Sequence, residues 1–349
     1  MASPGDKHAE ITVAKLGSLF LLFFLIAGGL GYPVLSRYDP RQTPGLSDVK
    51  IYAEMVSGTA GADAGHVRFR VLVPFVARQI YRIVDGRSAS WDPVMFSLLV
   101  ADSVFVAATA VLIVALGTRC LGNSTVGLLG AFVYLVNFAV PNLRLVGLVD
   151  AGEGFFLLAL LWSLVEGRLW PLPLIAILGT LTKESFVPFS IAFGAVWWLV
   201  MRSGRVSDRQ LAETPKRIGV WLTISWGVSW GAFVGLHRAI EGTFTSPLEF
   251  ALGLQGSHDS LASGCLAHFV RSLADHQLWY TFLWLLPTAI PKLKQFPRAW
   301  LAATGAACAV AFALDAFYGG APGTIGRALF TIAGPVLSLS SAKLLLGLL

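Results

Sequence analysis

The stretch Pro93–Gly117, PVMFSLLVADSVFVAATAVLIVALG, decides the fold class because it is apolar throughout and carries one charged residue, Asp102. About 20 apolar residues in a helix are enough to cross the ~30 Å hydrocarbon core of a bilayer. The whole chain of 349 residues is 55% hydrophobic and 13% charged, with a mean hydropathy of +0.69. A soluble chain carries roughly twice that charged fraction, about 25%. These values exclude a water-soluble enzyme and predict an all-α, polytopic transmembrane helix bundle.

Ten apolar stretches are long enough to be read as spans, with 16–35 retained as a signal anchor because no A-x-A-like cleavage site follows it. The predicted spans are 16–35, 93–117, 122–141, 145–166, 169–182, 185–201, 218–236, 277–290, 299–317 and 327–349. No internal repeat or low-complexity linker divides them. Residues 1–349 are therefore expected to form one transmembrane domain.

The distribution of Lys and Arg predicts a cytoplasmic N-terminus. With that orientation 13 of the 26 basic residues face the cytoplasm, and eight of the others lie in the long segment 36–91. Long loops count little in the positive-inside rule, and discounting this segment leaves 13 cytoplasmic cations against 5 outer ones. Segment 36–91 is then the first outer loop.

Two short helices are expected inside this loop. Residues 46–56 place Val49, Tyr52 and Val56 on one helical face, and residues 70–84 form an apolar stripe with arginines one turn apart. Such amphipathic helices are typical of the head-group layer. We expect both to cover the outer face of the bundle.

The spans 169–182 and 185–201 are short and joined only by Thr182-Lys183-Glu184, which indicates a hairpin with a charged tip. Backbone and charge at membrane depth must face protein or a water-lined cavity, because lipid cannot satisfy them. Lys183 and Glu184 are adjacent and point to different sides of a helix, so we expect them to have separate partners.

Given this threading, most ionisable side chains collect at the outer side, where one cavity can hold them. The candidates for such a polar site are Asp39, Asp48, Arg68, Arg70, Asp150, Glu153, Lys183, Glu184 and Arg327. Intramembrane charges are costly, by about 2.5–3.5 kcal/mol each on insertion scales, which favours a functional or paired interior over chance. Asp102, in mid-span, is expected to titrate or pair.

Several of these residues also have purely structural interpretations. Asp48 follows Ser47 at a helix start and would interact with the free N–H groups there, and Asp39 precedes Pro40 in a turn-like sequence. Arg68 and Arg70 would suit lipid phosphates as well as a substrate phosphate. Asp150 and Glu153 share a helix face and repel each other unless a cation lies between them, which Arg144 or Lys183 could supply.

Other features narrow the class of partner. The net charge of +6 is explained by basic loops that meet anionic membrane lipids, and no polar stretch is long enough to form a nucleic-acid-binding domain. Cys120, Cys265 and Cys308 fit neither a disulfide framework nor a zinc site. The histidines between 237 and 276 match no metal-ligand spacing and indicate a solvated loop.

No nucleotide-binding, zinc-protease or serine-hydrolase motif occurs in the chain, since GxxxxGK[ST], GxGxxG after a strand, HExxH and GxSxG are all missing. The energy for a reaction would therefore come from an ion gradient or from an activated substrate. A lipid-linked sugar is such a substrate, because its polyprenyl phosphate is a leaving group that resides in the membrane.

The order of one span, a long outer segment with Ser47-Asp48-Val49-Lys50-Ile51-Tyr52, and then Phe69-Arg70-Val71-Leu72-Val73-Pro74 resembles the type C superfamily of integral-membrane glycosyltransferases. Leu181-Thr182-Lys183-Glu184-Ser185 and Gly326-Arg327 before Gly334-Pro335 are similar to less-characterised bacterial members. Many members carry two adjacent acidic residues in the first outer loop, whereas here Asp39 and Asp48 stand nine apart.

This resemblance implies transfer of a hexosyl or pentosyl group from a polyprenyl-phosphate donor to an acceptor at the outer face of a bacterial inner membrane. By position, Asp48 is the first candidate for the catalytic base and Asp39 the second. Arg70, Lys183 and Arg327 would stabilise the departing phosphate, and Asp150 or Glu184 would orient sugar hydroxyls or hold a divalent cation. The sequence also leaves open a transporter or flippase and a noncatalytic membrane scaffold.

Overall fold

The all-α prediction is confirmed in a computed structural model, which describes residues 13–37, 47–59, 62–87, 91–203, 214–246, 261–318 and 324–348 and contains no strand within these ranges. The helices in chain order are α1 (Val13–Arg37), α2 (Ser47–Ser57), η2 (Ala62–Phe69), α3 (Leu72–Val84), α4 (Pro93–Leu121), α5 (Ser124–Leu135), η3 (Val140–Arg144), α6 (Asp150–Glu166), α7 (Leu172–Thr182), α8 (Phe186–Arg202), α9 (Pro215–Glu241), α11 (Leu261–Leu273), α12 (His276–Phe282), α13 (Leu285–Ala289), η4 (Ile290–Gln295), α14 (Arg298–Tyr318) and α15 (Thr324–Leu346).

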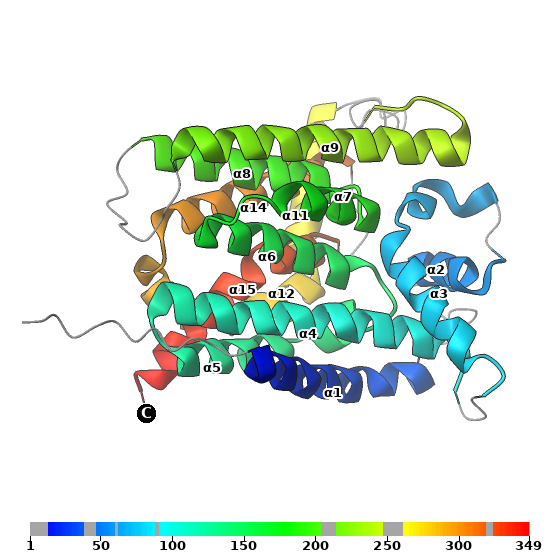
Figure 1. Ribbon diagram of the computed structural model, residues 1–349, viewed down its shortest axis with the longest axis horizontal. Helices are drawn as coiled ribbons and strands as arrows, with labels where there is room; N and C mark the ends of the chain where they lie inside the picture. The colour runs from blue at the N-terminus through cyan, green and yellow to red at the C-terminus, as the bar shows by residue number, and fades with distance from the viewer. Residues whose placement is uncertain are drawn as a thin grey trace, which may run out of the picture.

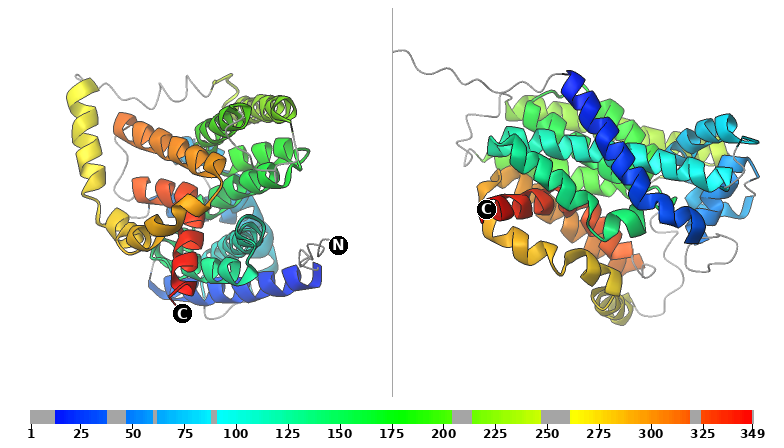
Figure 2. Two further views of the ribbon diagram at one scale, coloured as in Figure 1. Left: turned by 90° about the vertical axis from the view of Figure 1, so that its left-hand side faces the viewer. Right: turned by 90° about the horizontal axis from the view of Figure 1, so that it is seen from below.

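The helices from α4 to α9 run back and forth along the long axis of the molecule (Figure 1). α2, η2 and α3 gather at one end, which we call the site end, and α15 finishes at the opposite end, which we call the far end. Viewed from below, α1 crosses α4 obliquely, while α11 stands at an edge of the bundle and contacts α14 (Figure 2). The elements of segment 36–91 thus lie together at one end of the helix bundle.

In the described part of the chain, five helices are long and apolar enough to cross a membrane, which is compatible with an integral membrane protein. They are Ala14–Pro33 of α1, Pro93–Leu121 (α4), Pro215–Glu241 (α9), Arg298–Phe317 of α14 and Thr324–Leu346 (α15). Of the most apolar 18-residue stretch of each helix, 67% is buried inside the protein in α4 and 72% in α15, against 17% in α1 and 28% in α9. α4 and α15 are therefore the central helices, and α1 and α9 present their apolar side chains outward.

The prediction of ten spans is not confirmed. Five of the predicted spans fall on the five long helices, and the others fall on shorter elements: α5, α6, α7, α8 and the segment 277–290. α5 has 12 residues and α7 has 11, fewer than a bilayer crossing needs. Segment 277–290 is divided among α12, α13 and the start of η4. Hydropathy alone did not reveal these breaks, because every piece is apolar.

α4 and α5 approach each other closely at a glycine. A Cβ added at Gly127 of α5 would lie 2.6 Å from the carbonyl oxygen of Val114 in α4, so only glycine fits there. α5 begins where the side chain of Asn123 accepts hydrogen bonds from the N–H groups of Thr125 and Val126, at 2.9 and 3.1 Å. The N-cap and the glycine together fix α5 against α4.

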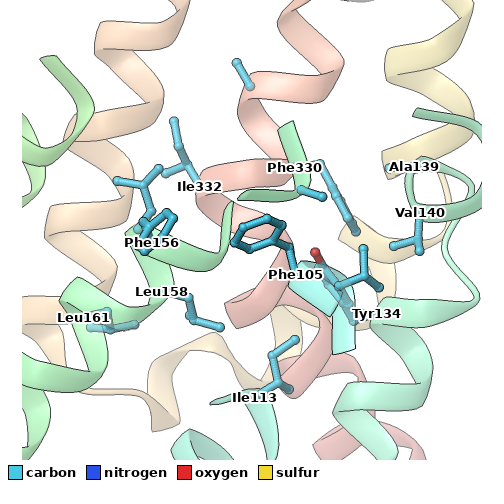
Figure 3. Close-up of a cluster of buried hydrophobic side chains, with 14 of the residues drawn as sticks. Phe105, Ile113, Tyr134, Ala139, Val140, Phe156, Leu158, Leu161, Phe330 and Ile332 are labelled. Atoms are coloured by element: carbon cyan, nitrogen blue, oxygen red, sulfur yellow. The ribbon is translucent and has the colours of Figure 1, made fainter. Parts of the chain in front are cut away.

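Apolar side chains from α4, α5, α6 and α15 meet in the core (Figure 3). The rings of Tyr134 and Phe330 stack with centroids 5.2 Å apart, and Phe105 lies 6.0 Å from Phe156. The Arg144 guanidinium lies 5.2 Å from the centroid of the Phe330 ring, a distance at which a cation is attracted to an aromatic face. The apolar core therefore adjoins a buried charge.

The predicted helices of the first outer loop are present as α2 and α3. Val49, Tyr52 and Val56 are buried on one face of α2, as the spacing predicts. This face packs against protein, since α2 contacts α3, η2 and α4. α3 buries Val73 and Ala77, whereas Phe75 on its other side is 60% exposed.

Candidate functional site

Seven charged residues from five segments meet at the site end, and we call them the charged cluster. They are Asp48, Arg70, Asp150, Glu153, Lys183, Glu184 and Arg327. Each lies in the first turn of a helix or between two helices, because α2, α6 and α15 begin here and α7 gives way to α8 here. The alternating direction of the helices brings these segments together.

Arg70, which directly follows η2, holds one half of the cluster together. Its Nε donates to Glu184 Oε2 at 2.8 Å, and its Nη2 donates to the other oxygen of the same carboxylate. Its Nη1 donates to the Tyr52 hydroxyl at 3.0 Å and to Asp48 Oδ2 at 3.3 Å. This guanidinium therefore bridges α2 and the turn between α7 and α8, with the two-point geometry that makes arginine–carboxylate pairs strong.

Lys183 holds the other half. Its Nζ lies 2.8 Å from Asp150 Oδ1 and 3.4 Å from Glu153 Oε2. Arg327 approaches the second oxygen of Asp150 at 3.4 Å, and the Ser185 hydroxyl donates to Glu153 Oε1 at 2.5 Å. The repulsion expected between Asp150 and Glu153 is thus offset by Lys183, one of the two cations that the sequence suggested.

Arg144 is the second of those cations. It is buried, donates to the backbone oxygen of Asp150 at 3.1 Å and donates to the Thr331 hydroxyl at 2.8 Å. A Cβ added at Gly154 would lie 2.3 Å from Arg144 Nη1, so glycine makes room for the guanidinium. Arg144 supplies a fourth cation beside four carboxylates, which leaves the cluster and its surroundings close to neutral.

The members of the cluster differ in their access to solvent. The side chain of Asp48 is 33% exposed, against 18% for Glu184, 3% for Asp150 and 0% for Glu153. Among the cations Arg327 is the most exposed, at 19%. Asp48 is therefore the charge of the cluster that is most open to solvent.

The pairing of Arg70 with Glu184 stabilises both charges. Burial by itself would raise the pKa of Glu184, yet the Arg70 guanidinium holds that pKa at about 2. Burial would likewise lower the pKa of Arg70, and the Glu184 carboxylate raises it well above its ordinary value. Both side chains therefore stay ionised at neutral pH.

The sequence predicted separate partners for Lys183 and Glu184, and the structure confirms this. Lys183 contacts Asp150 and Glu153, while Glu184 contacts Arg70. The backbone turn between α7 and α8 points the two adjacent side chains into different halves of the cluster. The predicted hairpin thus joins the two halves.

Two candidates are not part of the cluster. Arg68 pairs with Glu241 at the end of α9, on which η2 docks, and not with the other candidates. Asp39 lies outside the described residues. Asp102, expected to titrate or pair, accepts a hydrogen bond from the Gly147 N–H at 3.0 Å in the protein interior.

The expectation of a solvated histidine loop is wrong for His237. α9 continues to Glu241, five residues beyond the predicted end of the span, and His237 is only 1% exposed. The imidazole stacks on the Phe69 ring, with centroids 3.6 Å apart, and its Nδ1 lies 3.4 Å from Glu241 Oε2. Burial of a histidine by a distant segment leaves no signal in local spacing.

Sequence reasoning did not identify Tyr52 or Ser185 as site residues. Tyr52 counted only as part of the apolar face of α2, although its position one turn after Asp48 directs it toward the same partner. Ser185 directly follows the two predicted charges. No three His, Cys, Asp or Glu side chains among the described residues are arranged to hold a metal ion. The carboxylates of the charged cluster are bound by cationic side chains instead.

No model of a known protein family matches the chain, and no curated protein matches it.

Proposed function

We propose that this protein is a membrane glycosyltransferase of the type C fold that moves a sugar from a polyprenyl-phosphate donor to an acceptor hydroxyl. The observation that carries the proposal is the position of Asp48. Its carboxylate is the most exposed acid of the cluster and lies 3.3 Å from the Arg70 guanidinium, a cation that a phosphate could use. A base open to solvent next to buried positive charge is what transfer from a phosphate leaving group requires.

In this reaction the acceptor oxygen attacks the anomeric carbon of the sugar while Asp48 takes the hydroxyl proton. A bond forms between that oxygen and the anomeric carbon, and the bond from the anomeric carbon to the phosphate oxygen breaks with inversion. The electron pair leaves with the polyprenyl phosphate. Arg327, Lys183 and Arg70 stabilise the charge that develops on it, since buried cations act strongly at low dielectric.

The remaining acids have supporting roles in this proposal. Asp150 is held by Lys183 and Arg327, and Glu184 by Arg70. These pairs keep the cations in place until the substrate binds, and the two carboxylates then orient sugar hydroxyls. Arg68, paired with Glu241, fixes η2 instead of contacting the donor.

We further propose that the site end faces outward from a bacterial inner membrane, with the N-terminus in the cytoplasm. Cations dominate the far end: Arg119, Arg168, Arg202, Lys216, Arg217, Lys292, Lys294, Arg298 and Lys343. Among the described residues, Glu166 is the acid that accompanies them, in a pair with Arg119. Such an excess of basic residues is typical of the cytoplasmic side.

The proposal is tested with purified protein, a panel of radiolabelled polyprenyl-phosphate sugars and a membrane lipid extract. We expect label to leave one of the donors, and Asp48→Asn to reduce the rate at least 100-fold, the lower range for loss of a general base. Asp85→Asn is the matched control, because Asp85 is an exposed acid outside the cluster. Full activity in Asp48→Asn would contradict the assigned base, and no consumption of any donor by folded protein would contradict the function.

A transporter or flippase is the second candidate, and one observation favours it. The helical path breaks between α7 and α8 at a nearly neutral set of ion pairs, and broken helices of this kind hold substrates in transporters. The two functions differ in whether they need a sealed compartment. A transporter would move the labelled donor across a liposome membrane without breaking it, whereas an enzyme would convert the donor in detergent. If the protein shows neither activity, a noncatalytic scaffold is the remaining interpretation.

A further inference from the structure

The guanidinium of Arg70 is shared unequally among three partners. Glu184 takes Nε and Nη2 as a fork, and Nη1 is left with two hydrogens for the remaining partners. Nη1 lies 3.0 Å from the Tyr52 hydroxyl and 3.3 Å from Asp48 Oδ2. The tyrosine therefore has the closer contact, and the carboxylate has the longer one.

Tyr52 is held firmly in this position. Its side chain is 1% exposed and belongs to the apolar face of α2, which packs against α3 and α4. It lies one helical turn after Asp48, so the two side chains reach the same nitrogen from the same helix. A buried hydroxyl without a hydrogen bond is costly, which makes the contact with Arg70 part of the packing of α2.

We propose that Tyr52 is a positioning residue that sets how Arg70 is divided between Glu184 and Asp48. The hydroxyl takes one of the two Nη1 hydrogens at 3.0 Å and fixes the guanidinium where the other hydrogen reaches Asp48 only at 3.3 Å, which leaves that carboxylate loosely paired. Without the hydroxyl, the guanidinium can pivot about its fork with Glu184 and close on Asp48. The positioning of Arg70 by Tyr52 does not depend on the proposed function. Its benefit for catalysis does, because it matters only if Asp48 is the base.

The charged groups around this site are few among the described residues. Glu184 and Lys183 face Arg70 from the turn between α7 and α8, and His66 of η2 is close enough to interact with Arg70, Asp48 and Glu184. Asp48 and Tyr52 themselves come from α2. A change in the pH dependence of Asp48 modification in a Tyr52 variant can thus be attributed to the contact with Arg70, provided that the titration of His66 is followed in parallel.

The test measures the protonation of Asp48 directly and needs no substrate. Protein in detergent is treated with a water-soluble carbodiimide and an amine at several pH values, and modification of Asp48 is quantified by peptide mass spectrometry. Carbodiimides react with the protonated carboxyl group, so the pH midpoint of modification reports when Asp48 gains its proton. In Tyr52→Phe we expect this midpoint to fall by about 0.5 to 1 pH unit, because a closer opposite charge favours the ionised form.

Tyr134→Phe is the matched control, since Tyr134 is also a buried tyrosine but stacks on Phe330 in the core. Its midpoint should equal that of the unmodified chain. In an Arg70→Lys background, where no Nη1 exists, Tyr52→Phe should produce no further shift. An unchanged or raised midpoint in Tyr52→Phe would overturn the proposal, and Tyr52→Met provides the same test if the phenylalanine variant does not fold.

The outcome is independent of the glycosyltransferase assay. A shifted midpoint in a protein that consumes no donor would retain the positioning role and reject the function. An active protein with an unshifted midpoint would retain the function and reject the positioning role of Tyr52.

Discussion

Removal of the Lys183 ammonium should destabilise the protein more than the loss of any surface cation. Its Nζ contacts the buried carboxylates of Asp150 and Glu153 at 2.8 and 3.4 Å. In Lys183→Met both acids would lose this cation, and breaking a buried ion pair on one side costs about 3–5 kcal/mol. Arg327 and Arg144 still interact with Asp150, so we expect about 3 kcal/mol, the lower end of that range.

For a chain of this size, a loss of 3 kcal/mol corresponds to a fall of roughly 5 °C in Tm, by extension of the trend for smaller domains. Intrinsic tryptophan fluorescence in detergent would measure it, with the same heating rate for every variant. Lys216→Met is the control, because Lys216 is exposed at the far end, and it should stay within about 1 °C of the parent protein.

A second substitution tests the electrostatic explanation. In Lys183→Met with Glu153→Gln, one of the two abandoned charges is neutralised while Ser185 can still donate to the side-chain oxygen. About half of the lost stability should return. If Lys183→Met is no less stable than Lys216→Met, or if neutralising Glu153 lowers Tm further, the reasoning from buried charge is refuted.

Three further predictions concern packing, pH and the docking of η2. Gly127→Ala should cost about 1–3 kcal/mol and lower Tm, because its Cβ would clash with the α4 backbone, whereas Gly227→Ala, in open space on α9, should not. The Arg70–Glu184 pair depresses the pKa of Glu184 from 4.5 to about 2, so its stabilisation is complete above pH 4.5 and is lost as the pH falls toward 2. A Glu184→Gln variant should show a smaller fall of Tm across that window. Phe69→Ala should cost roughly 3 kcal/mol and speed hydrogen exchange in η2, and unchanged exchange there would contradict its docking on α9.

Local patterns predicted the elements whose spacing is set within one helix. The apolar face of α2 follows from 3.6-residue periodicity, which needs no knowledge of the rest of the chain. The separate partners of Lys183 and Glu184 were also predicted, although the two residues lie in the turn between α7 and α8 and not in a helix. The long central helix α4 was equally predictable, although its end lies four residues beyond Gly117. In each case the deciding interaction is local.

The remaining features depend on contacts between distant segments. α5 and α7 are apolar enough to be read as spans, but their lengths are set by turns that hydropathy does not detect. Arg68 and Arg70 are only two residues apart, yet the first pairs with Glu241 at the end of α9 and the second with Glu184 between α7 and α8. The role of Tyr52 is hidden in the same way, because its apolar ring satisfies the helix pattern whether or not its hydroxyl has a partner.

The near-neutral balance of the charged cluster has a consequence for how it would take up an anion. Arg70, Lys183 and Arg327 are already engaged by carboxylates of the protein itself. An incoming phosphate must exchange places with one of those carboxylates, so its affinity is a difference between two ion pairs. Added salt weakens both pairs, and the dissociation constant should therefore vary less steeply with ionic strength than at a bare cationic surface.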